Sequence, residues 1–206
     1  MLPKGFQHLA GYFERPAQTA LLMAIRSVLA QAPLYTPCMP RTGKAMSVRM
    51  SNCGTLGWLT DKDGGYRYQK VYPETGQAWP PIPTVLMDLW RDVVPQAPPP
   101  EACLINYYGA GTRLGSHVDS DEQDRSVPVV SVSLGDEGVF HVGGSKRTDP
   151  KTRMPLRSGD VVVLGGAARL AYHGIDRIVP GSSDLIAEGG RFNLTLRRVT
   201  LMRAAA

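Results

Sequence analysis

The chain has 206 residues, of which 43% are hydrophobic and 20% charged, and its formal net charge is +5. The hydrophobic content is ample for a packed core, and the length is near the upper end of a usual single domain. No apolar run approaches the roughly 20 residues that a spanning helix needs, and the first residues carry no secretory signal pattern. These features exclude a helical membrane protein, and we expect a cytoplasmic one.

The three cysteines, Cys38, Cys53 and Cys103, are widely spaced and form no C-x-x-C pair. An odd count at such spacing is not typical of a disulfide framework or of a zinc site. The modest basic excess is compatible with a polyanionic partner such as nucleic acid, but many soluble proteins share it. Charge alone therefore does not identify the partner.

Two helices are predicted in the first half of the chain, over residues 15–31 and 83–94. Pro16 suits a first helical turn. Apolar residues recur at helical spacing in both segments: Leu21, Leu22, Ile25, Val28 and Leu29, then Leu86, Leu89, Trp90 and Val93. The region 35–80 between them is rich in Gly, Thr, Ser, Tyr and basic residues, which favours short strands and loops.

From Ala102 onward the pattern becomes typical of strands, with turns rich in Gly, Pro and Asp. The predicted strands are 102–108, 114–119, 128–135, 138–142, 160–164, 169–173 and 191–199. Helices first and strands after them indicate the α+β class with a jelly-roll, or double-stranded β-helix, core. We expect one domain over 1–206, and a loose tail at Ala204–Ala206.

Two distant motifs suggest a metal site. His117-Val118-Asp119 would lie on an extended segment, where side chains two residues apart point to the same face. A second imidazole, His173, follows much later. Two histidines and one carboxylate form the facial triad that binds non-haem Fe(II) and leaves positions open for substrate and O₂. An H-x-D tripeptide alone is weak evidence, because it also occurs by chance.

The last predicted strand alternates strictly between polar and apolar residues. Its polar face carries Arg191, Asn193, Thr195 and Arg197, and its apolar face carries Phe192, Leu194 and Leu196. Buried arginines would be costly unless paired, and a dicarboxylate ligand would pair them bidentately. An edge strand with a solvated polar face is a comparable interpretation of this segment alone. Asn106 and Tyr108 similarly place an amide and a phenol on one strand face, where both can form hydrogen bonds. The alternative interpretation is a tyrosine that packs in the core.

Taken together, these motifs resemble those of the AlkB-type dioxygenases. The motifs Asn106-x-Tyr108, His117-x-Asp119, His173 and Arg191-x-Asn193-x-Thr195-x-Arg197 occur in that family's order. The resemblance runs from about residue 40 to the end, and is closest to the bacterial founding member. The family implies Fe(II), 2-oxoglutarate as cosubstrate and O₂. It also implies a nucleotide-recognition lid over about 40–80 and a catalytic core over about 102–200.

The resemblance also implies residue roles. His117, Asp119 and His173 would ligate Fe(II). Arg191, Asn193 and Tyr108 would hold the distal carboxylate of 2-oxoglutarate, with Asn106 and Arg197 near its 1-carboxylate. On the substrate side, Trp58 and the His117 ring would enclose a flipped base, while Tyr66, Asp121 and Arg147 would contact the nucleotide. Without the resemblance, Trp58 could be a lid core residue and Tyr66 a hairpin surface residue. We expect His141 at the surface or in the cavity wall.

The implied activity is oxidative demethylation of alkylated bases such as 1-methyladenine and 3-methylcytosine in DNA, with release of formaldehyde, succinate and CO₂. The partner would be alkylated single-stranded DNA, with double-stranded DNA or RNA as further candidates, and the enzyme a monomer without membrane contact. The segment 61–65 looks one residue longer than in the founding member, so substrate preference could differ. The alternatives are a related dioxygenase acting on RNA, free nucleotide or protein, a non-catalytic jelly-roll binder of nucleic acid, and a structural zinc protein.

Overall fold

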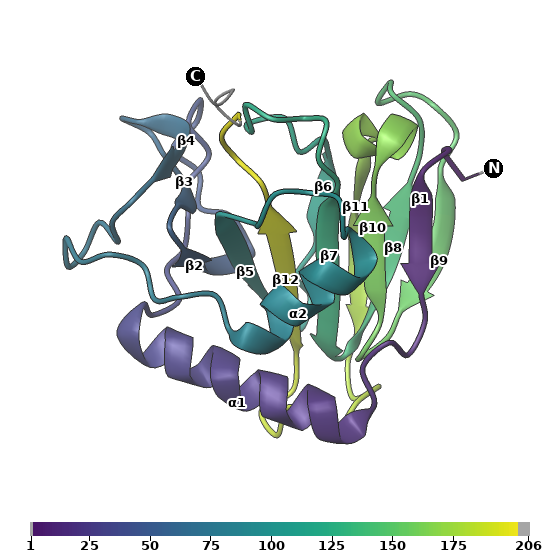
Figure 1. Ribbon diagram of the computed structural model, residues 1–206, viewed down its shortest axis with the longest axis horizontal. Helices are drawn as coiled ribbons and strands as arrows, with labels where there is room; N and C mark the ends of the chain where they lie inside the picture. Colours follow the sequence, from purple (N-terminus) through teal and green to yellow (C-terminus); the bar gives the residue numbers. More distant parts are fainter. Residues whose placement is uncertain (1, 202–206) are drawn as a thin grey trace.

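The computed structural model describes residues 2–201, so the tail expected at 204–206 lies outside the described range. Two antiparallel sheets form the body of the molecule and a third, short sheet stands beyond one end (Figure 1). The larger sheet has the order β1 (Phe6–Leu9), β10 (Val161–Leu164), β7 (Val129–Gly135), β12 (Arg191–Arg197), β5 (Ala102–Tyr108) and β2 (Arg49–Gly54). The smaller sheet has the order β6 (Leu114–His117), β11 (His173–Val179), β8 (Glu137–Val142) and β9 (Thr152–Leu156). The third is the hairpin of β3 (Gly57–Asp61) and β4 (Gly65–Gln69).

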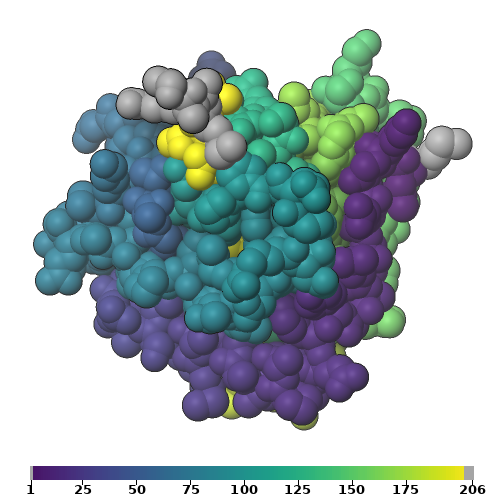
Figure 2. Space-filling model, in the orientation of Figure 1, coloured from purple at the N-terminus to yellow at the C-terminus, as the bar shows by residue number. Residues whose placement is uncertain are grey.

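Two helices cover one face of the larger sheet, α1 (Arg15–Gln31) and α2 (Thr84–Val93) (Figure 1). In the space-filling view, the helices and the segments that follow them cover most of that sheet (Figure 2). The main apolar cluster joins the helices to the sheet through Leu21, Ile25, Leu86, Trp90, Val132, Leu194 and Leu196. Neither helix of the described range is long and apolar enough to cross a membrane.

The opposite face of the larger sheet packs toward the smaller sheet. A second apolar cluster draws on both sheets, with Leu104 and Val162 from the larger and Phe140, Val142 and Ile175 from the smaller. The third sheet has its own small cluster, in which Leu59 packs with Tyr72 and Trp79. The layers are therefore helices, larger sheet and smaller sheet, as the α+β jelly-roll prediction requires.

Strand β12 lies between β7 and β5, and all seven of its residues are buried. The interpretation of this segment as an edge strand with a solvated face is therefore wrong. Phe192, Leu194 and Leu196 pack in the cluster under the helices, as the alternation predicts. Arg191 and Arg197 consequently point to the other side, between the two sheets, where charge is costly to bury.

Both predicted helices are confirmed, and most predicted strands are found within two or three residues of their expected bounds. The strand expected over 169–173 is wrong, because Gly166–Leu170 forms a 3-10 helix and β11 begins at His173. Gly166 has φ +53°, a turn conformation that glycine adopts without strain, and good helix formers follow it. The prediction did not include β1 and β9, which are short edge strands of 4 and 5 residues.

The final strand ends at Arg197 rather than at 199 for an identifiable reason. The backbone amides of Val199 and Thr200 donate to the carboxylate of Glu101 at 2.9 and 2.7 Å. These amides therefore leave the ladder for a charged acceptor. Strand β6 likewise ends at His117, so Asp119 lies just past the strand rather than within it.

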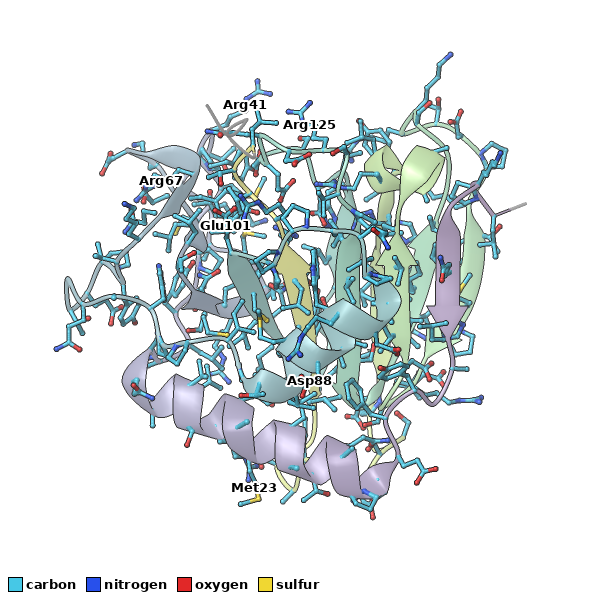
Figure 3. All side chains as sticks on the ribbon, in the orientation of Figure 1. Met23, Arg41, Arg67, Asp88, Glu101 and Arg125 are labelled. Atoms are coloured by element: carbon cyan, nitrogen blue, oxygen red, sulfur yellow. The ribbon has the colours of Figure 1, made fainter. Side chains whose placement is uncertain are left out.

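We predict that Leu194→Ala lowers the free energy of unfolding by about 2–5 kcal/mol, because Leu194 is fully buried at the centre of the sheet. Met23→Ala is the control, since Met23 is 67% exposed and points away from the sheet on α1 (Figure 3), and should change stability by less than about 0.5 kcal/mol. Urea denaturation measures both. Equal midpoints for the two variants would contradict the central position of β12.

Candidate active site

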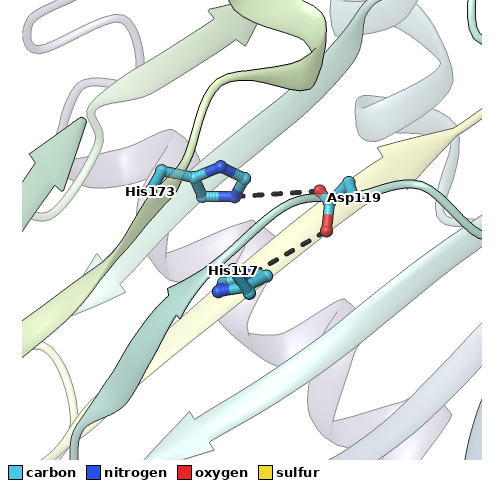
Figure 4. A group of neighbouring side chains, drawn as sticks. All are labelled: His117, Asp119 and His173. Atoms are coloured by element: carbon cyan, nitrogen blue, oxygen red, sulfur yellow. Dashed lines mark ion pairs between the residues drawn. The ribbon is translucent and has the colours of Figure 1, made fainter. Parts of the chain in front are cut away.

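His117, Asp119 and His173 lie together at one end of the smaller sheet (Figure 4). His117 ends β6 and His173 begins β11, and the two residues are direct partners in the strand register. Their Nε2 atoms lie 3.8 and 3.9 Å from the two carboxylate oxygens of Asp119. These separations are too long for hydrogen bonds. One atom from each of the three residues lies within 4.8 Å of the others, so a single ion could contact all three.

The opposite nitrogen of each ring is already occupied. His117 Nδ1 lies 2.9 Å from the carbonyl oxygen of Gly115, and His173 Nδ1 lies 2.9 Å from that of Ala171. A carbonyl oxygen only accepts, so Nδ1 carries the hydrogen and the Nε2 lone pair faces Asp119. Burial, with the nearby His117 ring, lowers the pKa of His173 to about 4. Its imidazole is therefore neutral near pH 7, the form that ligates metals.

Asp119 is held as a carboxylate by a buried arginine. Arg197 Nη2 lies 2.9 Å from Asp119 Oδ1, and both side chains are at least 93% buried. Burial alone would raise the pKa of Asp119, but Arg197 and the two imidazoles outweigh it, and the pKa is well below its usual range. The same pairing raises the pKa of Arg197 despite its burial. The pair engages Oδ1 of Asp119 and leaves Oδ2, which lies 3.9 Å from His173 Nε2, available to an ion.

Arg191 is the least compensated charge between the sheets. It is 1% exposed, and within residues 2–201 the only hydrogen bond from its guanidinium is from Nη2 to the Ser133 hydroxyl, at 2.8 Å. Its Nε and Nη1 atoms are buried and have no partner among the described residues. The ring of Tyr108 lies 5.4 Å from the guanidinium carbon. Unpartnered donors of this kind fit a carboxylate, which a guanidinium binds bidentately.

Asn106 and Asn193, the two asparagines predicted to lie at this site, differ in whether their amide atoms already have hydrogen-bond partners. Asn106 is buried, and its Oδ1 has no partner among the described residues. Asn193, in contrast, donates from Nδ2 to the Ser131 hydroxyl at 2.6 Å and to the Val132 carbonyl at 3.1 Å. Its Oδ1 accepts a hydrogen bond from the Thr195 hydroxyl. Asn193 lines the cavity, but its amide is already committed to β7 and has no free donor.

A cavity of about 680 Å³ joins the triad, both arginines and the base-side residues expected from the sequence. That volume is within the usual range for small-molecule sites. Two of the aromatic residues that line it, Trp58 and Tyr66, belong to the hairpin. Trp58 stacks on Tyr66 with ring centroids 5.7 Å apart, and Trp58 Nε1 donates to Asp121 Oδ2 at 2.7 Å. Arg147 lines the same cavity, with its guanidinium 5.2 Å from the Tyr172 ring.

The other two histidines lie elsewhere. His141 is not at the surface, since it is 4% exposed, and its Nδ1 lies 2.7 Å from Asp176. Its ring fits over Gly174, where a Cβ would come within 2.9 Å of it. His8 lies 2.9 Å from Asp160. Neither is part of the cluster of possible metal ligands found within the described residues.

Sequence reasoning did not find three polar residues beside the triad: the partly buried Tyr68 and the buried Glu122 and Arg169. Arg169 donates to Glu122 and to the backbone oxygen of Asp119, and Tyr68 donates to Glu122. Tyr68 follows Tyr66 by two residues, but the sequence around it gives no sign of its partner. Glu122 stands in an acidic run that would ordinarily be solvated.

The model of the 2OG-Fe(II) oxygenase superfamily matches residues 5–197. The chain belongs to this family. It is 49% identical to the alpha-ketoglutarate-dependent dioxygenase AlkB homolog of Caulobacter vibrioides over 194 residues, which cover 94% of this chain and 87% of that protein. It is 42% identical to the alpha-ketoglutarate-dependent dioxygenase AlkB of Escherichia coli over 186 residues, or 88% and 85% of the two chains. The solved structure of OsALKBH1 superposes with a TM-score of 0.79 at 30% identity, covering 96% of this chain and 100% of that one.

This 2OG-Fe(II) oxygenase is therefore an AlkB-type dioxygenase that uses Fe(II), 2-oxoglutarate and O₂. The residues present fit those groups. The triad offers two imidazole nitrogens and a carboxylate oxygen to one ion, and Arg191 offers a carboxylate two buried donors that have no partner among the described residues.

We predict that Asp119→Asn weakens Mn(II) binding at least roughly 100-fold while the protein stays folded, because the charged oxygen donor is lost. Calorimetric titration with Mn(II), a redox-stable probe, measures the affinity. Asp184→Asn is the matched control, because Asp184 is exposed and pairs only with Arg15. Unchanged Mn(II) affinity in Asp119→Asn would remove Asp119 from the metal site.

Proposed function

We propose that this enzyme is an oxidative demethylase that repairs N-alkylated bases, such as 1-methyladenine and 3-methylcytosine, in DNA. The observation that carries the proposal is one cavity lined by the triad, by Arg191 with its single hydroxyl partner among the described residues, and by the aromatic face of the hairpin. Relatives that match shorter stretches, of 102 and 133 residues, are named a DNA N(6)-methyladenine demethylase in Arabidopsis thaliana and a tRNA demethylase in Schizosaccharomyces pombe. Both names describe enzymes that act on nucleic acid.

In this proposal His117, Asp119 and His173 hold Fe(II). Arg191 and Tyr108 bind the distal carboxylate of 2-oxoglutarate, and Arg197 and Asn106 lie toward its 1-carboxylate. Asn193, which has no free donor, keeps β12 and β7 in register behind that carboxylate. Bound Fe(II), with 2-oxoglutarate and O₂, supplies the oxidising power that hydroxylates the N-methyl group. The hydroxymethyl base then releases formaldehyde, while the cosubstrate leaves as succinate and CO₂.

The cavity rim supports a flipped base as the substrate. An enzyme that acts on a base atom must take that base out of the stack, and aromatic faces offset the cost. Trp58 and the His117 ring both line the cavity and would enclose the base. The Asp121 carboxylate suits a cationic methylated base, Tyr66 is 50% exposed and suits the nucleotide backbone, and Arg147 suits a phosphate.

We assign residues 40–80, which include the β3–β4 hairpin, to a nucleotide-recognition lid and residues 102–200 to the catalytic core of a single domain. Leu59 of the hairpin packs with Tyr72 and Trp79 of the same segment, which supports that division. The preferred partner is alkylated single-stranded DNA, because a base that is already unpaired costs less to extrude. The proposed active form is a monomer, since the triad, both arginines and the aromatic face come from one chain.

The test is formaldehyde release from single-stranded oligonucleotides that carry 1-methyladenine or 3-methylcytosine, as DNA and as RNA. The protein is purified anaerobically and supplied with Fe(II), 2-oxoglutarate, ascorbate and O₂. Release from the DNA that stops without 2-oxoglutarate is the expected result. Release from RNA alone would move the substrate to RNA. Succinate without formaldehyde from either would keep the dioxygenase and refute nucleic-acid demethylation.

We predict that Arg191→Ala raises the KM for 2-oxoglutarate by roughly 10- to 100-fold, because a charge-assisted bidentate contact is lost. Oligonucleotide affinity should change less than about twofold. Steady-state succinate formation and fluorescence anisotropy measure the two quantities. Arg26→Ala is the control, since Arg26 is half-exposed and pairs with Glu188 at the surface. Loss of oligonucleotide binding with an unchanged KM would refute the carboxylate role of Arg191.

A further inference from the structure

Glu122 lies at the centre of a buried polar network beside the triad. It is 2% exposed. Its Oε1 accepts a hydrogen bond from the Tyr68 hydroxyl at 2.5 Å, and its Oε2 accepts one from Arg169 Nη2 at 2.9 Å. Arg197 Nη1 lies 3.1 Å from the Tyr68 hydroxyl and 3.5 Å from Glu122 Oε1. The guanidinium that holds Asp119 therefore also contacts a tyrosine of the hairpin.

The chain connects the same two regions through a four-residue segment. Asp119 belongs to the triad, Asp121 accepts a hydrogen bond from Trp58, and Glu122 accepts one from Tyr68. Trp58 and Tyr68 are direct partners across the β3–β4 hairpin. The aromatic face of the hairpin is thus fixed to the residues that immediately follow the metal-ligating carboxylate, by two separate hydrogen bonds.

The network contains equal numbers of buried positive and negative charges, so no member can move away without leaving an unpaired charge. Two carboxylates, Asp119 and Glu122, face two arginines, Arg169 and Arg197, and all four side chains are at least 93% buried. Arg169 also donates to the backbone oxygens of Asp119 at 2.7 Å and Val127 at 2.9 Å. Breaking one buried pair leaves an uncompensated charge and is strongly unfavourable. A displacement of the Tyr68 hydroxyl is therefore transmitted to its partners rather than absorbed locally.

We propose that Tyr68 and Glu122 are positioning residues that couple a base bound under the hairpin to the geometry of Asp119 and Arg197. The inference rests on the proposed function, because it concerns the same cavity. When a base stacks on Trp58, the hairpin and Tyr68 are held in place. Tyr68 then fixes Glu122 and Arg197, and Arg197 fixes the carboxylate that binds the metal next to 2-oxoglutarate.

Tyr66 lies on the same face of β4 as Tyr68, but its side chain has different surroundings. It is 50% exposed and stacks on Trp58, whereas Tyr68 places its hydroxyl among the buried charges. Tyr68 has an oxygen that both donates and accepts, so it joins Glu122 to Arg197. Replacing Tyr68 by phenylalanine removes that oxygen and keeps the ring.

The experiment measures linkage between two ligands. Affinity for 2-oxoglutarate is measured by calorimetry on the Mn(II)-loaded protein, with and without a saturating single-stranded DNA that carries 1-methyladenine. In the wild-type protein we expect the oligonucleotide to tighten 2-oxoglutarate binding by about tenfold. In Tyr68→Phe we expect this factor to fall to about twofold or less. Linkage is reciprocal, so oligonucleotide affinity with and without 2-oxoglutarate must give the same factor.

The matched control is Tyr72→Phe. Tyr72 is buried next to the hairpin in the cluster with Leu59 and Trp79, and its hydroxyl contacts the Pro33 carbonyl rather than the network. It should keep the wild-type linkage. A general loosening of the hairpin would lower oligonucleotide affinity in both variants, without a selective loss of linkage in Tyr68→Phe.

A second readout needs no oligonucleotide. In Tyr68→Phe the affinity for Mn(II) in the presence of 2-oxoglutarate should fall severalfold, because Arg197 loses a partner beside Asp119, and it should not fall in Tyr72→Phe. Full linkage retained in Tyr68→Phe, or no linkage in a wild-type protein that binds the oligonucleotide, would overturn the coupling alone. A wild-type protein that binds no oligonucleotide would overturn the proposed function as well.

Discussion

The structure depends on one electrostatic constraint, the burial of two guanidinium groups on the central strand β12. Arg197 is compensated by Asp119 and by Glu122 at a longer distance, whereas Arg191 has a single hydroxyl partner and two unpartnered nitrogens. Nothing in the packing of the sheets requires a charge at Arg191, and its burial alone lowers the pKa of its guanidinium. A carboxylate that binds this guanidinium would stabilise it. Without such a ligand the buried charge lowers the stability of the folded protein, and this is the cost of keeping a binding site there.

This arrangement is possible because the two faces of the larger sheet have different neighbours: the helices cover one face, and the smaller sheet lies against the other. The apolar side chains of β12 pack under α1 and α2, and this packing secures the strand that carries both arginines. Between the sheets, the smaller sheet brings His117 and His173 to one end as register partners. The segment after β6 then supplies Asp119, Asp121 and Glu122, which reach respectively the histidines, Trp58 and Tyr68. A few adjacent residues therefore join the proposed metal site to the hairpin.

Sequence reasoning predicted the fold class, both helices and the polar face of the last strand, because these follow from periodicity within one segment. It also identified residues that line one cavity. It did not find β1 or β9, whose short edges carry little pattern, and it expected a strand where Gly166 begins a 3-10 helix. Glu122, Arg169 and Tyr68 could not be found, because the hydrogen bonds that join them link residues 47 or more positions apart in the chain. Nor could the sequence reveal that the amide of Asn193 is already occupied.

We infer that the guanidinium of Arg191, whose Nε and Nη1 have no partner among the described residues, selects a dicarboxylate cosubstrate. It is tested most directly by comparing 2-oxoglutarate with 2-oxopentanoate, which has the same carbon chain but no distal carboxylate. Calorimetry on the Mn(II)-loaded wild-type protein gives both affinities. The account predicts that 2-oxoglutarate binds at least about tenfold more tightly, as the loss of a charge-assisted contact requires. Equal affinities would contradict it, since Arg191 would then contribute nothing to recognition.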